Sequence, residues 1–232
     1  RGISAQSQAD GDTLRIANSR FTLNNNALYH YTQGTGAQVV VRDNTFTNTT
    51  NTVIEAYSGR SSSHPQWQVI DNTATGFGGY GLLLDRAGNL EITGNSFATT
   101  KEYTQGFYLE GYGTRSVISD NTVSVGTSSN SCCYAGINYG GNNDDETLTL
   151  TGNQITGGDY GLQVYVPNNA TTTISNNSVT GTAYAGVYIR NYNNNNVTVQ
   201  NNTVEDNSGV GIDLEGTVSV FSGNIMRRNQ NG

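Results

Sequence analysis

One motif recurs along the whole chain and constrains its fold more than any other feature. It consists of two apolar residues separated by one residue, an Asn three positions later, and a further apolar residue two positions after the Asn, as in Val39, Val41, Asn44 and Phe46. The Asn position of successive copies falls at Ser19, Asn44, Asn72, Asn95, Asn121, Asn153, Asn177, Asn202 and Gly223. Repeats about 25 residues apart are typical of solenoids, in which each repeat adds one structural unit to a stack.

A second apolar segment follows each copy and is usually introduced by glycine. Examples begin at Gly81, Gly106, Gly161, Gly186 and Gly211. Apolar residues alternate with other types in these segments, which is the pattern of β-strands. Since no stretch between the strands has helical periodicity, βαβ units are excluded.

These patterns predict an all-β protein, a parallel β-helix (solenoid) of about nine coils that forms a single domain over residues 1–232. The repeated Asn predicts a ladder of stacked side chains that satisfies backbone groups at a tight bend. The residue before it is usually Asp, Gly or Asn, as a left-handed turn position requires.

Composition narrows the function. Only 12% of residues are charged, the net charge is −7, and Asn, Thr and Gly together supply 90 of the 232 residues. An acidic chain lacks the basic surface that nucleic acid requires, and no apolar run approaches the roughly 18 residues of a membrane span. Abundant Asn and Thr with a single Lys favour an extracellular or cell-surface location.

The repeats resemble those of the right-handed parallel β-helices of the pectate-lyase-like superfamily. This superfamily includes polysaccharide lyases, polygalacturonases, alginate epimerases, phage tailspikes and noncatalytic surface proteins. The resemblance covers essentially the whole chain and implies a right-handed helix. It also implies that carbohydrate would bind an outward sheet face.

The alternation of the glycine-marked strands defines two outward columns on such a face. Together they hold six Tyr and five carboxylates in 18 positions. Tyr combines a flat apolar ring with a hydroxyl group, which suits stacking on sugars or on another protein. The predicted glycan-binding residues are Tyr29, Tyr31, Tyr57, Tyr108, Tyr165, Tyr188 and Arg190.

Three carboxylates, Glu55, Asp85 and Glu110, belong to consecutive coils and are the catalytic candidates if the protein is an enzyme. Neighbouring coils place Asp85 and Glu110 about 5 Å apart. Such a pair could serve a glycoside hydrolase as acid and nucleophile, or hold Ca²⁺ for a polysaccharide lyase acting on uronic acids. It could equally be a solvated acidic ladder balanced by Arg86 and Arg190.

Several enzyme motifs of the superfamily are missing. Asp144 and Asp145 form an adjacent pair like the Asp-Asp motif of the polygalacturonases, but the motifs that accompany it there are missing. Neither His30 nor His64 is flanked by glycine, as the Gly-His-Gly motif of those enzymes requires. His30 falls on an inward position, which predicts a buried residue rather than a base. Lys101, the sole Lys, could reach the Glu110 region, although a plain loop residue is the simpler interpretation.

No cofactor is predicted beyond Ca²⁺. Asp144 and Asp145 are weak metal candidates because EF-hand spacing is missing. Cys132 and Cys133 are adjacent; a vicinal disulfide, a link to another chain and two thiols all remain open.

No end caps are evident in the sequence. The chain opens on a unit resembling a second strand, and joining its last residues to its first continues the repeat. Either the chain is cut from a longer β-helix or copies stack head to tail into a fibre. We therefore expect a secreted or surface fibre-forming β-helix whose Tyr and acidic face meets glycans or neighbouring filaments. The alternatives are the enzyme described above and a phage tailspike fragment.

Overall fold

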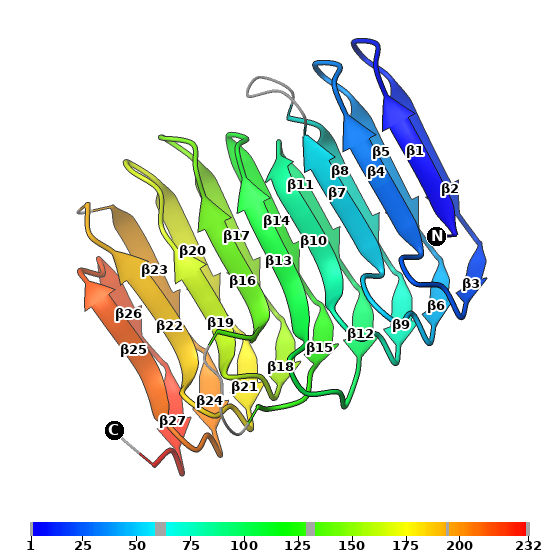
Figure 1. The fold of residues 1–232 in the computed structure, drawn as a ribbon. Helices are drawn as coiled ribbons and strands as arrows, with labels where there is room; N and C mark the ends of the chain where they lie inside the picture. Colours follow the sequence, from blue (N-terminus) through cyan, green and yellow to red (C-terminus); the bar gives the residue numbers. More distant parts are fainter. Residues whose placement is uncertain (1, 59–63, 129–132, 194, 231–232) are drawn as a thin grey trace.

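A computed structural model describes residues 2–58, 64–128, 133–193 and 195–230 of the chain. The described residues form 27 β-strands and no helix, arranged in three parallel sheets of nine strands each (Figure 1). Sheet A consists of β1 (Ile3–Ser7), β4 (Leu28–Thr32), β7 (Ile54–Ser58), β10 (Tyr80–Ala87), β13 (Gln105–Gly111), β16 (Ala135–Gly141), β19 (Tyr160–Tyr165), β22 (Ala185–Asn191) and β25 (Val210–Gly216).

The other two sheets follow the same order along the stack. Sheet B consists of β2 (Thr13–Ala17), β5 (Gln38–Arg42), β8 (Gln66–Ile70), β11 (Leu90–Thr93), β14 (Arg115–Ser119), β17 (Thr147–Thr151), β20 (Thr171–Ser175), β23 (Asn196–Gln200) and β26 (Val220–Ser222). Sheet C consists of β3 (Arg20–Thr22), β6 (Thr45–Thr47), β9 (Thr73–Thr75), β12 (Ser96–Ala98), β15 (Thr122–Ser124), β18 (Gln154–Thr156), β21 (Ser178–Thr180), β24 (Thr203–Glu205) and β27 (Ile225–Arg227).

Each coil contributes one strand to each sheet, and the coils stack as a right-handed parallel β-helix of about nine turns. This confirms the predicted fold. Sequence analysis did not separate the short strands of sheet C, because three residues are too few to show an alternation. They hold the last apolar residue of the motif.

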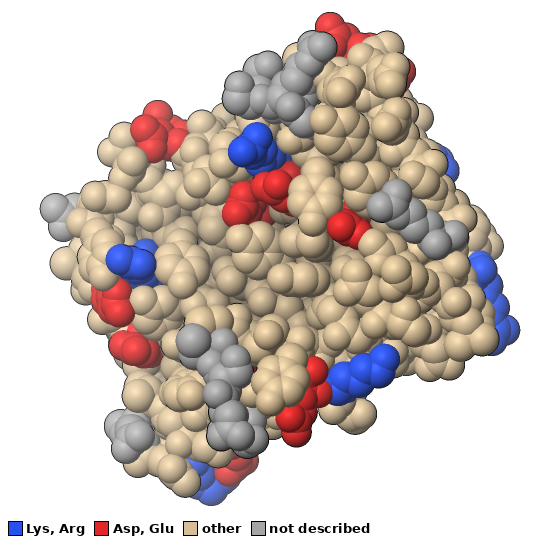
Figure 2. Space-filling model, in the orientation of Figure 1, with Lys and Arg blue, Asp and Glu red and all other residues tan. Residues whose placement is uncertain are grey.

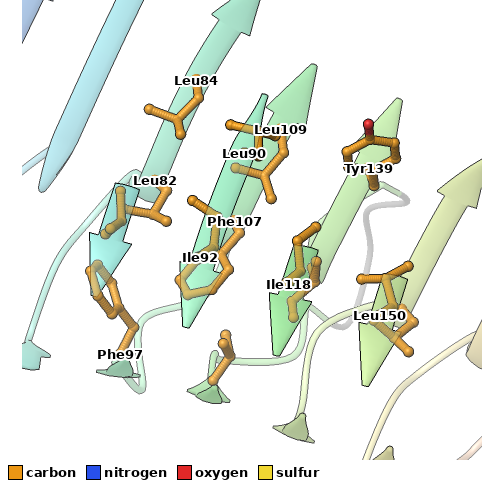
Figure 3. Packing of buried hydrophobic residues seen from close by; sticks show 14 of the residues in the cluster. Leu82, Leu84, Leu90, Ile92, Phe97, Phe107, Leu109, Ile118, Tyr139 and Leu150 are labelled. Atoms are coloured by element: carbon orange, nitrogen blue, oxygen red, sulfur yellow. The ribbon is translucent and has the colours of Figure 1, made fainter. Parts of the chain in front are cut away.

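The interior is a continuous column of apolar side chains from all three sheets. Leu82, Phe107 and Ile137 are in register in sheet A, and none of the three is exposed. Figure 3 shows how side chains from the three sheets meet along the axis. The alternation read from the sequence therefore marked the core correctly.

The Asn ladder is present and continuous. The Asn121 backbone amide and side-chain Nδ2 both donate to Asn153 Oδ1, at 3.1 and 2.9 Å, and the same contacts link Asn44 through Asn202. The residue before each Asn has a positive φ, for example 56° at Asp120, as predicted. One assignment was wrong: the last ladder residue is Asn224, which accepts from Asn202, and Gly223 takes the positive-φ position.

The marker glycines are required by close packing. A Cβ on Gly106 would collide with the Gly136 carbonyl oxygen of the next coil and with the Val123 side chain. The strands of sheet A therefore begin where the backbone of one coil lies directly against its neighbours.

The last coil is the least buried part of the described chain. Val220, Phe221, Ile225 and Met226 are each more than 40% exposed, whereas their counterparts in the central coils are buried. None of the described segments forms a helix with the length and apolar character that a membrane span requires.

Candidate functional site

The outward columns of sheet A lie as the alternation predicted. Strand register places Tyr29 beside Glu55, Tyr108 beside Asn138, and Tyr165 beside Arg190. The predicted glycan-binding residues and the three predicted catalytic carboxylates therefore share one face of the molecule. Their contacts divide them into two groups along the axis.

The first group occupies the N-terminal half of the face. The rings of Tyr29 and Tyr57 lie 6.3 Å apart, and Glu55 accepts a hydrogen bond from Asn26 Nδ2. Partial burial and the neighbouring Glu55 carboxylate raise the pKa of Tyr57 to about 12, so this phenol stays protonated and can donate.

Asp85 and Glu110 lie opposite each other at a β-bulge. Strand β10 has one extra residue between Leu84 and Ala87 relative to β13, so that Asp85 and Arg86 together oppose Glu110. Arg86 adopts a φ of 55°, which turns the strand at this point. The register alone pairs Asp85 with Glu110, and the bulge adds Arg86 opposite the same residue.

Glu110 is a perturbed carboxyl group. Burial and a hydrogen bond shared with Asp85 raise its pKa, whereas the Tyr108 hydroxyl and the charge of Arg86 act to lower it. Tyr108 Oη donates to Glu110 Oε1 at 2.9 Å, and burial together with Glu110 raises the pKa of Tyr108.

The second group occupies the C-terminal half of the face. The Tyr165 and Tyr188 rings meet edge to face at 6.1 Å. The Arg190 guanidinium lies 4.6 Å from the centre of the Tyr192 ring and 3.7 Å from Glu215 Oε2, and the Tyr192 hydroxyl donates to the same oxygen. Arg190, a predicted glycan-binding residue, therefore contacts both Tyr192 and Glu215.

A hollow of about 360 Å³ separates the two groups. Gly140 forms part of its floor and leaves it open, because no atom lies within 4 Å of the position that a Cβ on this residue would take. The side chains around it come from β13, β16, β19 and the loop after β16, and are Tyr108, Glu110, Asn138, Asn142 and Tyr165.

The surface around these groups is mainly uncharged. In the view of Figure 2, acidic side chains appear in a few separate places, several of them next to a basic side chain. The face therefore combines aromatic rings and amides with isolated charges.

Some participating residues were missed by sequence analysis. Tyr80 packs edge to face on Tyr108 at 6.2 Å, and Tyr160 stacks on Tyr184 at 6.1 Å. These rings lie at the start of the sheet A strands or just before them, outside the two columns. The recurrence of Tyr at that point of several repeats was the available signal.

The structure places the remaining polar candidates elsewhere. His30 is fully buried between the Ser7 and Thr32 hydroxyls, as predicted, and burial lowers its pKa to about 4. Lys101 donates from Nζ to the Gly76 carbonyl at 3.0 Å and lines a different hollow, next to sheet C. The interpretation of Lys101 as a loop residue therefore fits better than a role near Glu110.

Asp144 and Asp145 occupy the turn before β17. The next residue, Glu146, points inward, where it accepts hydrogen bonds from Ser116 Oγ and Tyr139 Oη, and burial raises its pKa. Within the described ranges, no three His, Cys, Asp or Glu side chains gather as a metal site. Cys132 lies outside the described residues, so the predicted disulfide with Cys133 stays a prediction.

Comparison with known protein families agrees with this architecture. Residues 127–232 match the family described as right handed beta helix region. Residues 1–129, more than half of the chain, match the family described as periplasmic copper-binding protein (NosD). The chain therefore belongs to the NosD family of β-helix proteins. No curated protein matches it.

The described residues do not offer the donor set that copper prefers. Copper sites use imidazole, thiolate or thioether ligands. Both ring nitrogens of His30 are hydrogen-bonded in the core, and His64 stacks on Tyr112, 4.7 Å between ring centres. Met226 lies on β27 and the exposed Cys133 precedes β16, and no three His, Cys, Asp or Glu side chains gather among the residues that the structure describes.

Proposed function

We propose that this protein is an extracytoplasmic β-helix whose sheet A face binds carbohydrate. The observation that carries the proposal is the paired arrangement of tyrosines on that face, with rings in contact at 6.3 Å in one group and 6.1 Å in the other. Rings held by neighbours offer flat apolar surfaces at low entropic cost, and their hydroxyls add polar contacts.

Hydrolysis by Asp85 and Glu110 is the alternative to carbohydrate binding at this face. Retaining glycoside hydrolases hold two carboxyl groups roughly 5–5.5 Å apart and inverting ones farther, so that a sugar or water fits between them. Asp85 and Glu110 face each other from neighbouring coils, and burial together with Asp85 raises the pKa of Glu110. The lyase and hydrolase alternatives stay untested predictions, as does the tailspike fragment.

The proposed location rests on composition and family. The NosD family is described as periplasmic, and the abundance of Asn and Thr with few charges suits life outside the cytoplasm. The copper in the family description is not part of our proposal, because the described side chains do not fit it.

A glycan array followed by calorimetry with the best soluble oligosaccharide tests the proposal. We expect the purified chain to bind at least one glycan, and Tyr188→Ala to weaken that binding about threefold to tenfold, because an aromatic contact contributes about 0.5–1.5 kcal/mol.

Tyr112→Ala is the matched control. Tyr112 follows β13 and stacks on His64, outside the outward columns, so its removal should leave the affinity unchanged. Absence of binding to any glycan by the folded protein, or equal losses in the two variants, would rule out the proposed face.

A second role, end-to-end stacking into a fibre, is favoured by the exposed apolar side chains of β26 and β27. We propose that the first coil of another copy pairs with this last coil. The axial order of side chains is compatible: the Phe221 and Met226 positions would meet Ile16 and Phe21, which belong to the same inward columns.

Electron microscopy and light scattering of the purified chain test this role. We expect rods longer than the ~40 Å that nine coils at about 4.8 Å provide. Phe221→Lys should shorten them, since a charge would then be buried at the contact. Thr198→Lys, on the outward side of the adjacent strand, is the control. Single particles at all concentrations would contradict stacking.

A further inference from the structure

The hollow between the two tyrosine groups is the most site-like feature of the sheet A face. Strand register puts Gly140 directly between Glu110 and Tyr165, one coil away on either side. Glu110 and Tyr165 are thus about 9.6 Å apart along the axis, at roughly 4.8 Å for each strand spacing. A side chain at Gly140 would fill this space, and glycine leaves it open.

The walls of the hollow combine the two kinds of group that recognise a sugar ring. Tyr165 provides an aromatic wall, and its hydroxyl is held by Gln163 Nε2 at 2.9 Å. On the opposite side, the Tyr108 hydroxyl is bonded to Glu110. The amides of Asn138 and Asn142 lie around the hollow and can donate to or accept from hydroxyl groups. Its volume of about 360 Å³ is within the range of small-molecule sites.

The charge around the hollow selects against an acidic ligand. Glu110 is the one charged residue among its described lining residues, and Asp85 lies beside it. Of the nearby cations, Arg190 contacts Glu215 and Tyr192, and the charge of Arg86 acts on Glu110 from outside the hollow. A uronate carboxylate here would face Glu110 and Asp85, and no Lys or Arg is among the described residues that line the hollow.

We propose that this hollow is a subsite for one uncharged sugar residue of a glycan, with Gly140 as the residue that keeps it open. The proposal rests on the proposed function and makes it more specific. The sugar ring packs on Tyr165, and its hydroxyls bond to the amides and to the Asp85–Glu110 pair. The uronic-acid polysaccharide expected for the enzyme alternative is disfavoured at this position.

The test compares Gly140→Trp with the wild-type chain on immobilised neutral, uronic-acid and amino-sugar polymers. We expect wild type to prefer neutral polymers, and Gly140→Trp to reduce their binding at least tenfold. Because the Gly140 side faces open space and its φ is not positive, the variant should keep the wild-type melting temperature within a few degrees.

Asn196→Trp is the matched control. Asn196 is an exposed outward residue of β23 in sheet B, so the new ring lies on a different face from the hollow and should leave binding unchanged. If Gly140→Trp does not fold, Asn138→Ala replaces it, with an expected loss of about threefold to tenfold.

The outcomes separate the two proposals. If wild type binds no glycan, the proposed function fails and the subsite with it. If wild type binds and Tyr188→Ala weakens binding while Gly140→Trp and Asn138→Ala do not, the face is retained and the subsite is wrong. Tighter binding of uronic-acid or amino-sugar polymers than of neutral ones overturns the assignment of an uncharged sugar.

Discussion

At the scale of single residues, the interior of the coil sets protonation states. His30 is inaccessible to solvent, contacts Ser7 and Thr32 through its ring nitrogens, and lies edge-on to Trp67 at 5.6 Å. Burial opposes its positive charge and lowers its pKa to about 4. The imidazole is therefore neutral in the folded protein at physiological pH.

The stability of the folded protein should therefore depend on pH through His30. Between pH 6.5 and pH 4 the unfolded chain takes up a proton at His30 that the folded chain does not, so the free energy of unfolding decreases as the pH falls. The loss approaches about 3 kcal/mol, since each pKa unit corresponds to about 1.4 kcal/mol. His30→Gln cannot titrate, and its stability should depend less on pH by that amount.

Urea unfolding followed by circular dichroism, at pH 4 to 7, measures the difference between wild type and His30→Gln. Taking the difference removes the contributions of other groups, including Glu146, whose raised pKa acts in the opposite direction. Parallel pH profiles of the two proteins would show that His30 is not the source.

At the scale of elements, the Asn ladder joins each bend to the next. Asn121 donates from Nδ2 to the Ile92 carbonyl at 2.8 Å and to Asn153, and its Oδ1 accepts from the amide and the side chain of Asn95. All of these contacts lie in the buried turn between sheets B and C. A ladder residue thus satisfies groups from three coils.

Removing a central rung should be costly. We expect Asn121→Ala to lower the free energy of unfolding by about 2–4 kcal/mol, because it leaves buried donors and acceptors without partners. Asn196→Ala is the control: Asn196 is exposed on β23, and the change should stay within about 0.5 kcal/mol. Chemical denaturation measures the free energy of unfolding of both variants. An equal decrease in the two would contradict a special role for the ladder.

The sequence identified the ladder well but misplaced its last member. Gly223 and Asn224 both fit the local pattern, and the choice depends on which one follows the positive-φ position. A second, shorter ladder of Thr182, Asn207 and Asn229 was not anticipated. Its members stand at another turn, where the surrounding residues vary too much to form a motif.

At the scale of the whole molecule, stacking turns sequence repeats into continuous surfaces. Each outward column carries one side chain from every coil, so tyrosines nearly 160 positions apart, from Tyr29 to Tyr188, share one face. Because each coil contacts mainly the coils next to it, its stability depends mainly on those neighbours. The exposed apolar side chains of the last coil, and the filament that we propose from them, are likewise properties of the whole stack.

The sequence by itself determined the coil repeat, the inward and outward positions and the columns of tyrosines and acids. These follow from a strand period of two and a repeat near 25 residues, both of which are local patterns. Tertiary structure alone decided the position of Arg86 opposite Glu110, the hollow at Gly140 and the contacts of Arg190 with Tyr192 and Glu215. Those features depend on a bulge in one strand and on side chains from different coils, whose meeting no local pattern encodes.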